Sequence, residues 1–244
     1  MRIRNLIRNP IAYFKELKKR SIRYRRSIMA SGNEVLCECC SWKGKAFFNN
    51  ECPKCKSLPR TRLIPFSIDY FQLAKEKMKV LHVAPNKSEY LGVKIKLNNT
   101  LQHDRLDIRP IKYANLIEDL TNLTLKDNIY DLVVIWHVFE HIVEDVKAIS
   151  EVHRVLKPGG RLLMSVPIYP ANSLITYEDK SILRENYEEV HGHDDHCRSC
   201  GLDYFNRFED AGFKTSELKV EKLTNEEILK FGLSKSHVVW CFTK

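Results

Sequence analysis

Two stretches of the chain decide its fold. Residues 131–142 read D-L-V-V-I-W-H-V-F-E-H-I, and residues 151–166 read E-V-H-R-V-L-K-P-G-G-R-L-L-M-S-V. The first is an apolar run typical of a buried strand, and it breaks into a helix near Phe139–His141. The second predicts an amphipathic helix that ends at Pro158-Gly159-Gly160, followed by another buried strand. Strand, helix and strand in this order indicate a largely parallel sheet covered by helices.

The same alternation continues on both sides of these stretches. Seven strands are predicted: Val80–Ala84, Thr100–His103, Ala114–Glu118, Asp131–Val138, Leu162–Val166, Thr215–Val220 and Val238–Phe242. Helices are predicted between them, notably at Glu140–Leu156 and Asp203–Ala211. The expected fold class is therefore α/β, with ligands bound beyond the carboxyl ends of the strands.

The charge of the chain is concentrated at its beginning. The 244 residues carry a net charge of +9, yet the first 30 alone hold ten Lys and Arg against the single acidic Glu16. The remainder is balanced, so the excess belongs to a basic amphipathic arm, residues 1–31, in which Pro10 should break or restart a helix. No apolar run approaches the ~20 residues of a membrane span. The arm is too charged for a cleaved secretory signal, which predicts a cytoplasmic location.

Residues 32–59 hold two C-x-x-C pairs, Cys37/Cys40 and Cys52/Cys55. Four thiolates in two such pairs suit the tetrahedral geometry of Zn²⁺, and a module this short needs a metal to fold. We therefore predict zinc ligation by these four cysteines, with Cys39 as a spare; the alternative is a set of buried or solvent-exposed thiols.

The turn after the first strand argues against a dinucleotide. It reads Pro85-Asn86-Lys87 and lacks the G-x-G-x-x-G that a pyrophosphate requires. A carboxylate at the end of the second strand can accept hydrogen bonds from both ribose hydroxyls of a nucleoside. Asp107 is the preferred residue and Asp104 the alternative, and Asp119 follows the third strand near the expected adenine edge. Each of these carboxylates could equally be a solvated loop residue.

H-V-F-E-H at 137–141 and L-K-P-G-G-R-L-L at 156–163 resemble class I S-adenosylmethionine-dependent methyltransferases, specifically the small-molecule type 11 branch. The likeness spans about residues 79–243. It implies a Rossmann-like, seven-stranded, mostly parallel sheet with helices on both faces and the last strand antiparallel between two others. It also implies S-adenosylmethionine as cofactor, in a pocket lined by His82, Ala84, Pro85, Asp107, Asp119, Leu120 and His137. Asn86 stands where an acidic residue is expected, so a contact to the amino-acid end of the cofactor is lost or moved.

The beginning of the chain resembles a bacterial subgroup of these enzymes that places a zinc-ribbon-like segment before the methyltransferase domain. The shared runs are C-P-x-C-x-S-L-x-R-x-R-L at 52–63 and L-H-x-A-P at 81–85. We therefore predict three parts: the basic arm over residues 1–31, the zinc-binding module over 32–59 and the methyltransferase domain over 60–244.

Residues 167–200 exceed what the minimal fold needs and are predicted to form a substrate lid. The T-x-E-D run at 176–179 and the run at 196–204 are similar to runs in that subgroup. Histidine titrates near neutral pH, so we expect His196, or else His141, to act as a base toward the methyl acceptor. Glu178, Asp179 and Arg198 are expected to position a polar substrate. Alternatively, His141 caps its helix and His196 bonds within the lid.

A second metal site is also conceivable in the lid. Its candidate ligands are His191, His193, His196, Cys197 and Cys200. The alternative is a His-rich loop over a pocket, and the resemblance gives no support for a metal role of the two cysteines.

Three functions are compatible with these features. The first is methyl transfer to a small-molecule or glycan-type acceptor, for instance in cell-surface polysaccharide biosynthesis, with the arm on the inner face of an anionic membrane. The second is an RNA methyltransferase that grips phosphates with the arm and the cysteine module, although the neutral body and the lack of an N-P-P-Y motif weigh against nucleic acid. The third is a non-catalytic, zinc-stabilised binding module. The arm could instead be a disordered tail or contact another subunit, and the sequence does not determine the oligomeric state.

Overall fold

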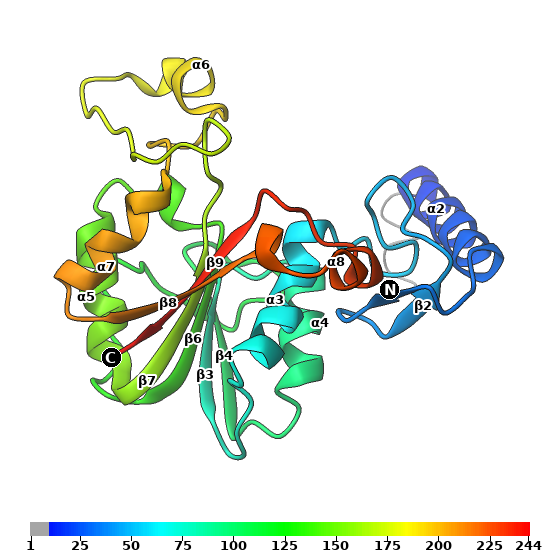
Figure 1. Cartoon of the computed structure of the whole chain (residues 1–244), viewed down its shortest axis with the longest axis horizontal. Helices are drawn as coiled ribbons and strands as arrows, with labels where there is room; N and C mark the ends of the chain where they lie inside the picture. Colours follow the sequence, from blue (N-terminus) through cyan, green and yellow to red (C-terminus); the bar gives the residue numbers. More distant parts are fainter. Residues whose placement is uncertain (1–9) are drawn as a thin grey trace.

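A seven-stranded sheet forms the centre of the computed structural model, which describes residues 10–244 (Figure 1). Its strands are β3 Lys79–Val83, β4 Gln102–Asp107, β5 Leu116–Ile117, β6 Tyr130–Trp136, β7 Leu156–Ser165, β8 Lys214–Lys219 and β9 Val238–Thr243. The strand order is β5-β4-β3-β6-β7-β9-β8. The first five strands in this order pair in parallel, whereas β9 runs antiparallel between β7 and β8. The predicted Rossmann-like topology is confirmed, including the antiparallel last strand.

Alternate residues of the strands pack into two separate apolar cores. Leu81 and Val83 of β3 lie in the core covered by α5 (Asp145–Val155) and α7 (Asn206–Asp210). Val80 points to the other face, which is covered by α3 (Pro59–Tyr70), α4 (Lys87–Lys96) and α8 (Asn225–Phe231). Because successive side chains of a strand point to opposite faces, one apolar strand contributes to both cores. The helices cover both faces of the sheet, as predicted.

Some boundaries differ from the predicted ones. The helix expected over Glu140–Leu156 begins as a 3₁₀ turn, η1 (Phe139–His141), and α5 starts only at Asp145. β7 begins at Leu156 instead of Leu162: Tyr130 pairs with Leu156 and Leu132 with Arg161, so the Pro-Gly-Gly segment bulges within the strand. The helix expected over Asp203–Ala211 is a 3₁₀ turn, η3 (Leu202–Phe205), followed by the short α7.

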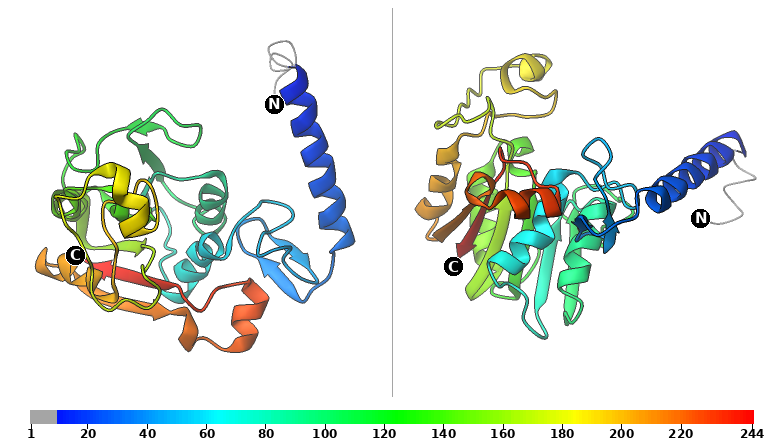
Figure 2. Two further views of the ribbon diagram at one scale, coloured as in Figure 1. Left: turned by 90° about the horizontal axis from the view of Figure 1, so that it is seen from above. Right: turned by 45° about the vertical axis from the view of Figure 1, so that its right-hand side comes forward.

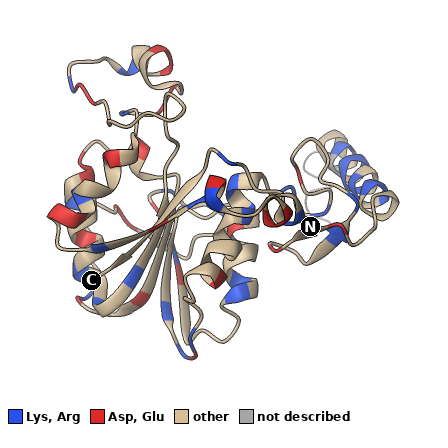
Figure 3. Ribbon diagram, viewed as in Figure 1, with Lys and Arg blue, Asp and Glu red and all other residues tan. Residues whose placement is uncertain are grey.

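The N-terminal part of the described chain stands apart from the sheet (Figure 2). Helix α2 (Pro10–Met29) starts at a proline, which fits the first turn of a helix, and carries a row of basic side chains (Figure 3). The hairpin of β1 (Val35–Cys37) and β2 (Trp42–Gly44) follows it. Residues 1–9 of the predicted arm, among them Arg2, Arg4 and Arg8, lie outside the described residues. Within 10–244, no helix combines the length and apolarity that crossing a membrane requires.

One buried arginine fastens the cysteine module to the body. Arg62 is 1% exposed, stacks over Phe47 at 3.8 Å and donates to the carbonyls of Asn50 and Ser57 in the module. It also donates to the carbonyls of Phe231 and Gly232 at the end of α8. Five N–H donors on a planar group allow one side chain to join these segments.

Candidate active site

Three neighbouring strands end at one level, and their last residues define the candidate site. Val83 lies opposite Leu106 and Ile135, so Ala84, Asp107 and Trp136 are level across β3, β4 and β6. The backbone N–H of Ala84 donates to Leu106 O (2.6 Å), and that of His137 donates to Ser165 O (2.9 Å). The predicted residues Ala84, Asp107 and His137 therefore meet at the carboxyl edge, beneath the segment 167–200 that carries α6 (Tyr187–His191) (Figure 1).

Two of these residues have left-handed backbone. Ala84 has φ 49° and His137 has φ 53°, a region that residues with a Cβ rarely occupy. Such conformations cost about 1–3 kcal/mol each and are concentrated at functional sites. They turn the chain sharply at the ends of β3 and β6.

The two candidate ribose carboxylates have different surroundings. Asp107 ends β4, is 4% exposed, and its Oδ1 accepts from the N–H of Arg109 (2.8 Å). A carboxylate offers about four acceptor positions, so capacity remains for two ribose hydroxyls. Asp104 lies in mid-strand, where its Oδ2 accepts from the hydroxyl of Tyr130 (2.7 Å) at the start of β6. The structure brings Asp107, and not Asp104, to the carboxyl edge.

The other predicted cofactor residues lie around this edge. Asp119 follows β5 and is exposed, and its Oδ1 accepts from the N–H and hydroxyl of Thr121. Leu120 is buried in the core beneath. Pro85 follows Ala84 and leads into the N-cap of α4.

His82 is fully buried in β3 and stacks parallel to His103 at 5.9 Å. Burial, followed by the charges of His103 and Arg105, lowers the pKa of His82 to about 3. Both of its ring nitrogens lack a hydrogen-bond partner among the described residues. His82 therefore presents a neutral imidazole with unused hydrogen-bonding capacity, one residue before the end of β3.

Asn86 has a structural task at the start of α4. Its Oδ1 accepts from the N–H groups of Ser88 and Glu89, and Glu89 accepts from the N–H of Asn86 in return. This capping box gives Asn86 a structural role, because Asn is among the best N-caps. Glu89 is buried, and desolvation raises its pKa to about 7.

A cluster of imidazoles lies where η1 meets the lid. His141 and His196 have ring centroids 4.9 Å apart, and His193 stacks on His196 at 4.8 Å. The buried Glu140 and the lid residue Asp195 join them: Glu140 Oε1 is 3.8 Å from His141 Nε2, and Asp195 Oδ1 is 2.6 Å from His193 Nδ1. Burial lowers the pKa of His196, which favours the neutral ring. The structure brings the two predicted bases together, but the predicted site omitted Glu140 although it stands within the H-V-F-E-H motif.

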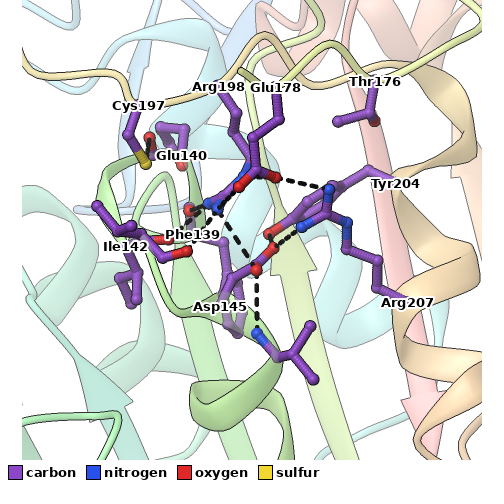
Figure 4. A network of polar contacts seen from close by, with 12 residues as sticks. Phe139, Glu140, Ile142, Asp145, Thr176, Glu178, Cys197, Arg198, Tyr204 and Arg207 are labelled. Carbon is purple, nitrogen blue, oxygen red and sulfur yellow. Dashed lines mark hydrogen bonds and ion pairs between the residues drawn. The ribbon is translucent and has the colours of Figure 1, made fainter. Parts of the chain in front are cut away.

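Arg198 and Glu178 are occupied by the protein itself, contrary to the expectation that they position a substrate (Figure 4). The Arg198 side chain is 0% exposed and donates to the carbonyls of Phe139, Ile142 and Val143. Its remaining charge contacts are Asp145 (3.4 Å) and Glu178 (3.3 Å). Arg207 binds the same two carboxylates, at 2.6 and 2.8 Å. This network holds the lid against η1. Arg198 also donates to carbonyl groups that would accept hydrogen bonds from backbone N–H groups if the helix were continuous.

The remaining lid residues also have local partners. Asp179 is exposed, and its Oδ1 accepts from the N–H and hydroxyl of Ser181 in a turn. His191 is buried and bonds the hydroxyl of Ser199 (2.8 Å). Cys197 contacts the carbonyl of Glu140, and Cys200 is part of the apolar core. Of the five ligands considered for a second metal site, only His193 and His196 lie in the imidazole cluster.

The four predicted cysteine ligands converge at the other end of the molecule. Cys37 and Cys55 have sulfurs 3.6 Å apart, and Cys40 and Cys52 have sulfurs 3.7 Å apart. All four sulfurs lie within 4.8 Å of one another. Four thiolates at ~2.3 Å from a tetrahedral ion are separated by ~3.8 Å, so the arrangement fits Zn²⁺. Cys39 points elsewhere, toward the carbonyl of Thr61.

Comparison with known proteins agrees with this architecture. The family described as "Methyltransferase domain" matches residues 78–164. A probable S-adenosylmethionine-dependent methyltransferase of Mycolicibacterium smegmatis is 41% identical over 66 residues, which are 27% of this chain and 23% of that protein. The chain thus matches about a quarter of the length of that curated relative.

Two solved structures share the fold at low sequence identity. A methyltransferase from Archaeoglobus fulgidus superposes with a TM-score of 0.52 at 16% identity, over 75% of this chain and 94% of that one. A Burkholderia thailandensis 1,6-didemethyltoxoflavin-N1-methyltransferase, solved with S-adenosylhomocysteine, gives 0.52 at 12% identity over 76% and 78%. The sheet order and the family match agree: residues 78–164 match the methyltransferase domain family, and the sheet that contains them has the fold of solved methyltransferases.

Proposed function

We propose that the chain is an S-adenosylmethionine-dependent methyltransferase. The observation that carries this proposal is the placement of Ala84, Asp107 and His137 at or directly after the ends of three neighbouring parallel strands, beside the imidazole cluster. Asp107 would accept hydrogen bonds from the ribose hydroxyls, and the left-handed turn at Ala84 would let the nucleoside approach the backbone. S-adenosylmethionine supplies an electrophilic methyl group when bound.

The acceptor would be a polar small molecule or a glycan. Methyl transfer requires the acceptor atom to be held in line with the methyl group in a pocket that excludes water. The lid segment 167–200 supplies such a cover, and the imidazoles of His141 and His196 supply groups that bind or deprotonate a hydroxyl. Arg198 and Glu178 serve this function indirectly, because their ion pair keeps the lid in place.

The cysteine module and the basic helix complete the proposal. Cys37, Cys40, Cys52 and Cys55 would hold one Zn²⁺ as a structural ion, because four thiolates leave no open coordination position.

Helix α2 would rest on an anionic membrane, with a binding free energy of about 1 kcal/mol for each Lys or Arg near the surface. Exposed Ile11, Leu17 and Ile28 alternate there with basic residues, and co-sedimentation with anionic vesicles over a range of salt concentrations tests this part. An acceptor attached to a lipid, as in polysaccharide biosynthesis, would agree with that location.

Calorimetric titration of the full-length protein with S-adenosylhomocysteine tests the central proposal, with zinc measured on the same sample. We expect micromolar binding and one zinc per chain. Asp107→Ala should weaken binding about 10- to 100-fold, because a hydrogen bond to a charged group contributes about 1.5–3 kcal/mol. Asp210→Ala is the matched control: Asp210 is exposed at the end of α7, and its loss should leave the affinity unchanged.

Two results would count against the proposal. If the folded, zinc-loaded protein does not bind S-adenosylhomocysteine, the non-catalytic binding module becomes the better reading. If binding is tight but Asp107→Ala binds as well as the unaltered protein, the nucleoside lies elsewhere.

A further inference from the structure

The imidazole cluster has the composition of a metal site. Glu140, His141 and His196 each offer one ligand atom, and these atoms lie within 4.8 Å of one another. His193, Asp195 and His196 form an overlapping group with the same property. Nitrogen and oxygen donors of this kind bind borderline divalent ions such as Zn²⁺, Fe²⁺ and Co²⁺. The four cysteines of the N-terminal module form a separate group.

The distance between Glu140 and His141 suits two ligands of one ion. Glu140 Oε1 and His141 Nε2 are 3.8 Å apart, which is too long for a hydrogen bond. Two ligands that each lie ~2.1 Å from a shared ion are separated by roughly 3–4 Å, depending on the coordination angle. An ion placed between these atoms would therefore need little rearrangement.

Glu140 gives a second, independent indication. The residue is 1% exposed, and its Oε2 has no hydrogen-bond partner among the described residues. Its other oxygen lies 3.5 Å from His137 Nδ1. An ionised carboxylate is costly to bury unless it is paired or coordinates a metal. A divalent cation bound by Glu140 would supply a charge partner for this buried carboxylate.

Asp195 orients His141 as a metal ligand requires. His141 Nδ1 is 3.0 Å from the backbone oxygen of Asp195 and 3.2 Å from its Oδ1. A proton on Nδ1 leaves the lone pair of Nε2 free, on the side of Glu140. Metal-bound histidines almost always donate their other N–H to a carboxylate or a carbonyl in this way.

We infer that Glu140, His141 and His196 bind a divalent metal ion of the borderline class, with Asp195 as the outer carboxylate. Two histidines and one carboxylate leave coordination positions open, as in sites that bind substrate and unlike the four-cysteine site. Glu140 and His141 follow shortly after β6, and His196 comes from the lid, so the site would lie between the carboxyl edge of the sheet and the lid.

The ion would activate the acceptor, a consequence that rests on the proposed function. A hydroxyl of the acceptor bound to the ion loses its proton to solvent more easily. The resulting oxygen attacks the methyl carbon, a C–O bond forms, the C–S bond breaks, and its electron pair remains on sulfur. The products are the methyl ether and S-adenosylhomocysteine. His196 would act in this reaction as a ligand and not as a free base.

Binding of Co²⁺ to the full-length protein, with the zinc of the cysteine module left in place, tests this inference. We expect one Co²⁺ per chain, with weak visible absorption bands and without the intense near-ultraviolet band of cysteine-bound cobalt. Asp195→Asn should weaken Co²⁺ binding about 10- to 100-fold, as outer-shell changes do, and Glu140→Gln and His196→Ala should weaken it more. His153→Gln is the control, because His153 packs against Phe213 away from the cluster.

Each result of the Co²⁺ measurement either supports or overturns the proposed metal site. Absence of Co²⁺ binding by the unaltered protein, or equal binding by folded Glu140→Gln, would overturn the metal site. Circular dichroism of each variant shows whether it is folded, and Asp195→Asn, at a partly exposed lid position, provides a second variant if a buried one does not fold. S-adenosylhomocysteine binding measured on the same samples separates the two proposals: if it persists without Co²⁺ binding, only the metal inference fails.

Discussion

At the scale of single residues, the carboxyl edge of the sheet contains both residues with strained backbone and residues with shifted pKa values. Ala84 and His137 have left-handed backbone, His82 has a pKa lowered to about 3, and Glu89 has a pKa raised to about 7. All four lie in or next to the turns that leave β3 and β6 or begin α4. Perturbed pKa values and strained residues tend to gather at functional sites. Their coincidence at one edge supports the placement of the active site there.

Glu89→Gln should stabilise the protein above neutral pH. The raised pKa means that the folded state holds a proton that the unfolded chain releases near pH 4.5, so Glu89 lowers the free energy of unfolding as pH rises from 4.5 through 7. Glutamine keeps the capping acceptor without the buried charge. We expect a gain of about 1–3 kcal/mol at pH 8 that shrinks on acidification toward pH 4.5, measured by urea unfolding.

The chain contains a matched control for this change. Glu227 forms the same capping box with Thr224 at the start of α8, but it is only partly buried, and its hydrogen bonds with Thr224 lower its pKa. Glu227→Gln should therefore give no gain at pH 8. Equal effects of the two substitutions would show that burial of Glu89 does not control its ionisation.

At the scale of elements, ion pairs between residues of this chain hold the lid in place. Arg198 and Arg207 face Asp145 and Glu178, so the buried network is balanced, and Tyr204 adds a hydrogen bond to Asp145 (Figure 4). Removing one partner of such a network leaves an uncompensated buried charge, which costs about 3–5 kcal/mol. The position of the lid therefore depends mainly on Arg198, and less on contacts within α6, the short helix of the lid.

Arg198→Lys tests this dependence while keeping the charge. Lysine cannot reach three carbonyls and two carboxylates with one ammonium group, so we expect a loss of about 2–4 kcal/mol and faster proteolysis within 167–200. Arg207→Lys, at a position whose side chain is 28% exposed, should cost about 1 kcal/mol. Similar losses for the two variants would contradict a special role of Arg198. Chemical denaturation and limited trypsin digestion measure both effects.

The elements that sequence periodicity predicts well are those with apolar runs. β3, β6 and β9 begin and end close to the predicted residues, because nearly all of their side chains are buried and apolar. β8 also lies close to its predicted position, although most of its side chains are exposed or partly exposed. β4 was predicted only to His103, although it continues to Asp107, because Q-H-D-R-L-D looks polar. Its polar side chains bond within the structure: Asp104 with Tyr130, and Arg105 with the carbonyl of Tyr113. Such long-range partners are not visible in a local pattern.

The candidate site could be predicted only in part for the same reason, because partners that lie far apart in the sequence are not visible in a local pattern. Asp107 and the histidines can be proposed from the sequence because motif position and residue type agree, and their roles stay predictions. Charged residues in a lid suggest substrate binding, which is why Arg198 and Glu178 are proposed from the sequence, whereas their partners Asp145 and Arg207 lie in other elements. Glu140 is not among the residues proposed from the sequence, because only the fold shows that it lies beside the lid histidines.

At the scale of the whole molecule, the cysteine module is an integral part of the body. Ser88 of α4 donates to the carbonyl of Cys55, and Arg62 connects the module to α8. If the module binds Zn²⁺ as proposed, loss of the ion should destabilise more than the module itself, because metal binding and folding are coupled in such small units.

Cys40→Ser and Cys39→Ser form a matched pair for this prediction. Cys40 is one of the four clustered thiols, whereas the neighbouring Cys39 contacts the carbonyl of Thr61. Cys40→Ser should abolish zinc retention and lower the melting temperature by several degrees, whereas Cys39→Ser should retain one zinc per chain. Elemental analysis and calorimetry measure both, and zinc retained by Cys40→Ser would exclude a four-thiolate site.

The Arg62 contacts also constrain the order of events during synthesis. Its partners Phe231 and Gly232 lie 169 and 170 residues later in the chain. At about 5–20 residues per second, a ribosome needs roughly 10–30 s to produce the residues that separate them. The cysteines of the module are synthesised early, but the contacts of the module with α8 can form only after Gly232 has been synthesised. Docking on α8 is therefore a later step of the native assembly than any metal uptake by the module.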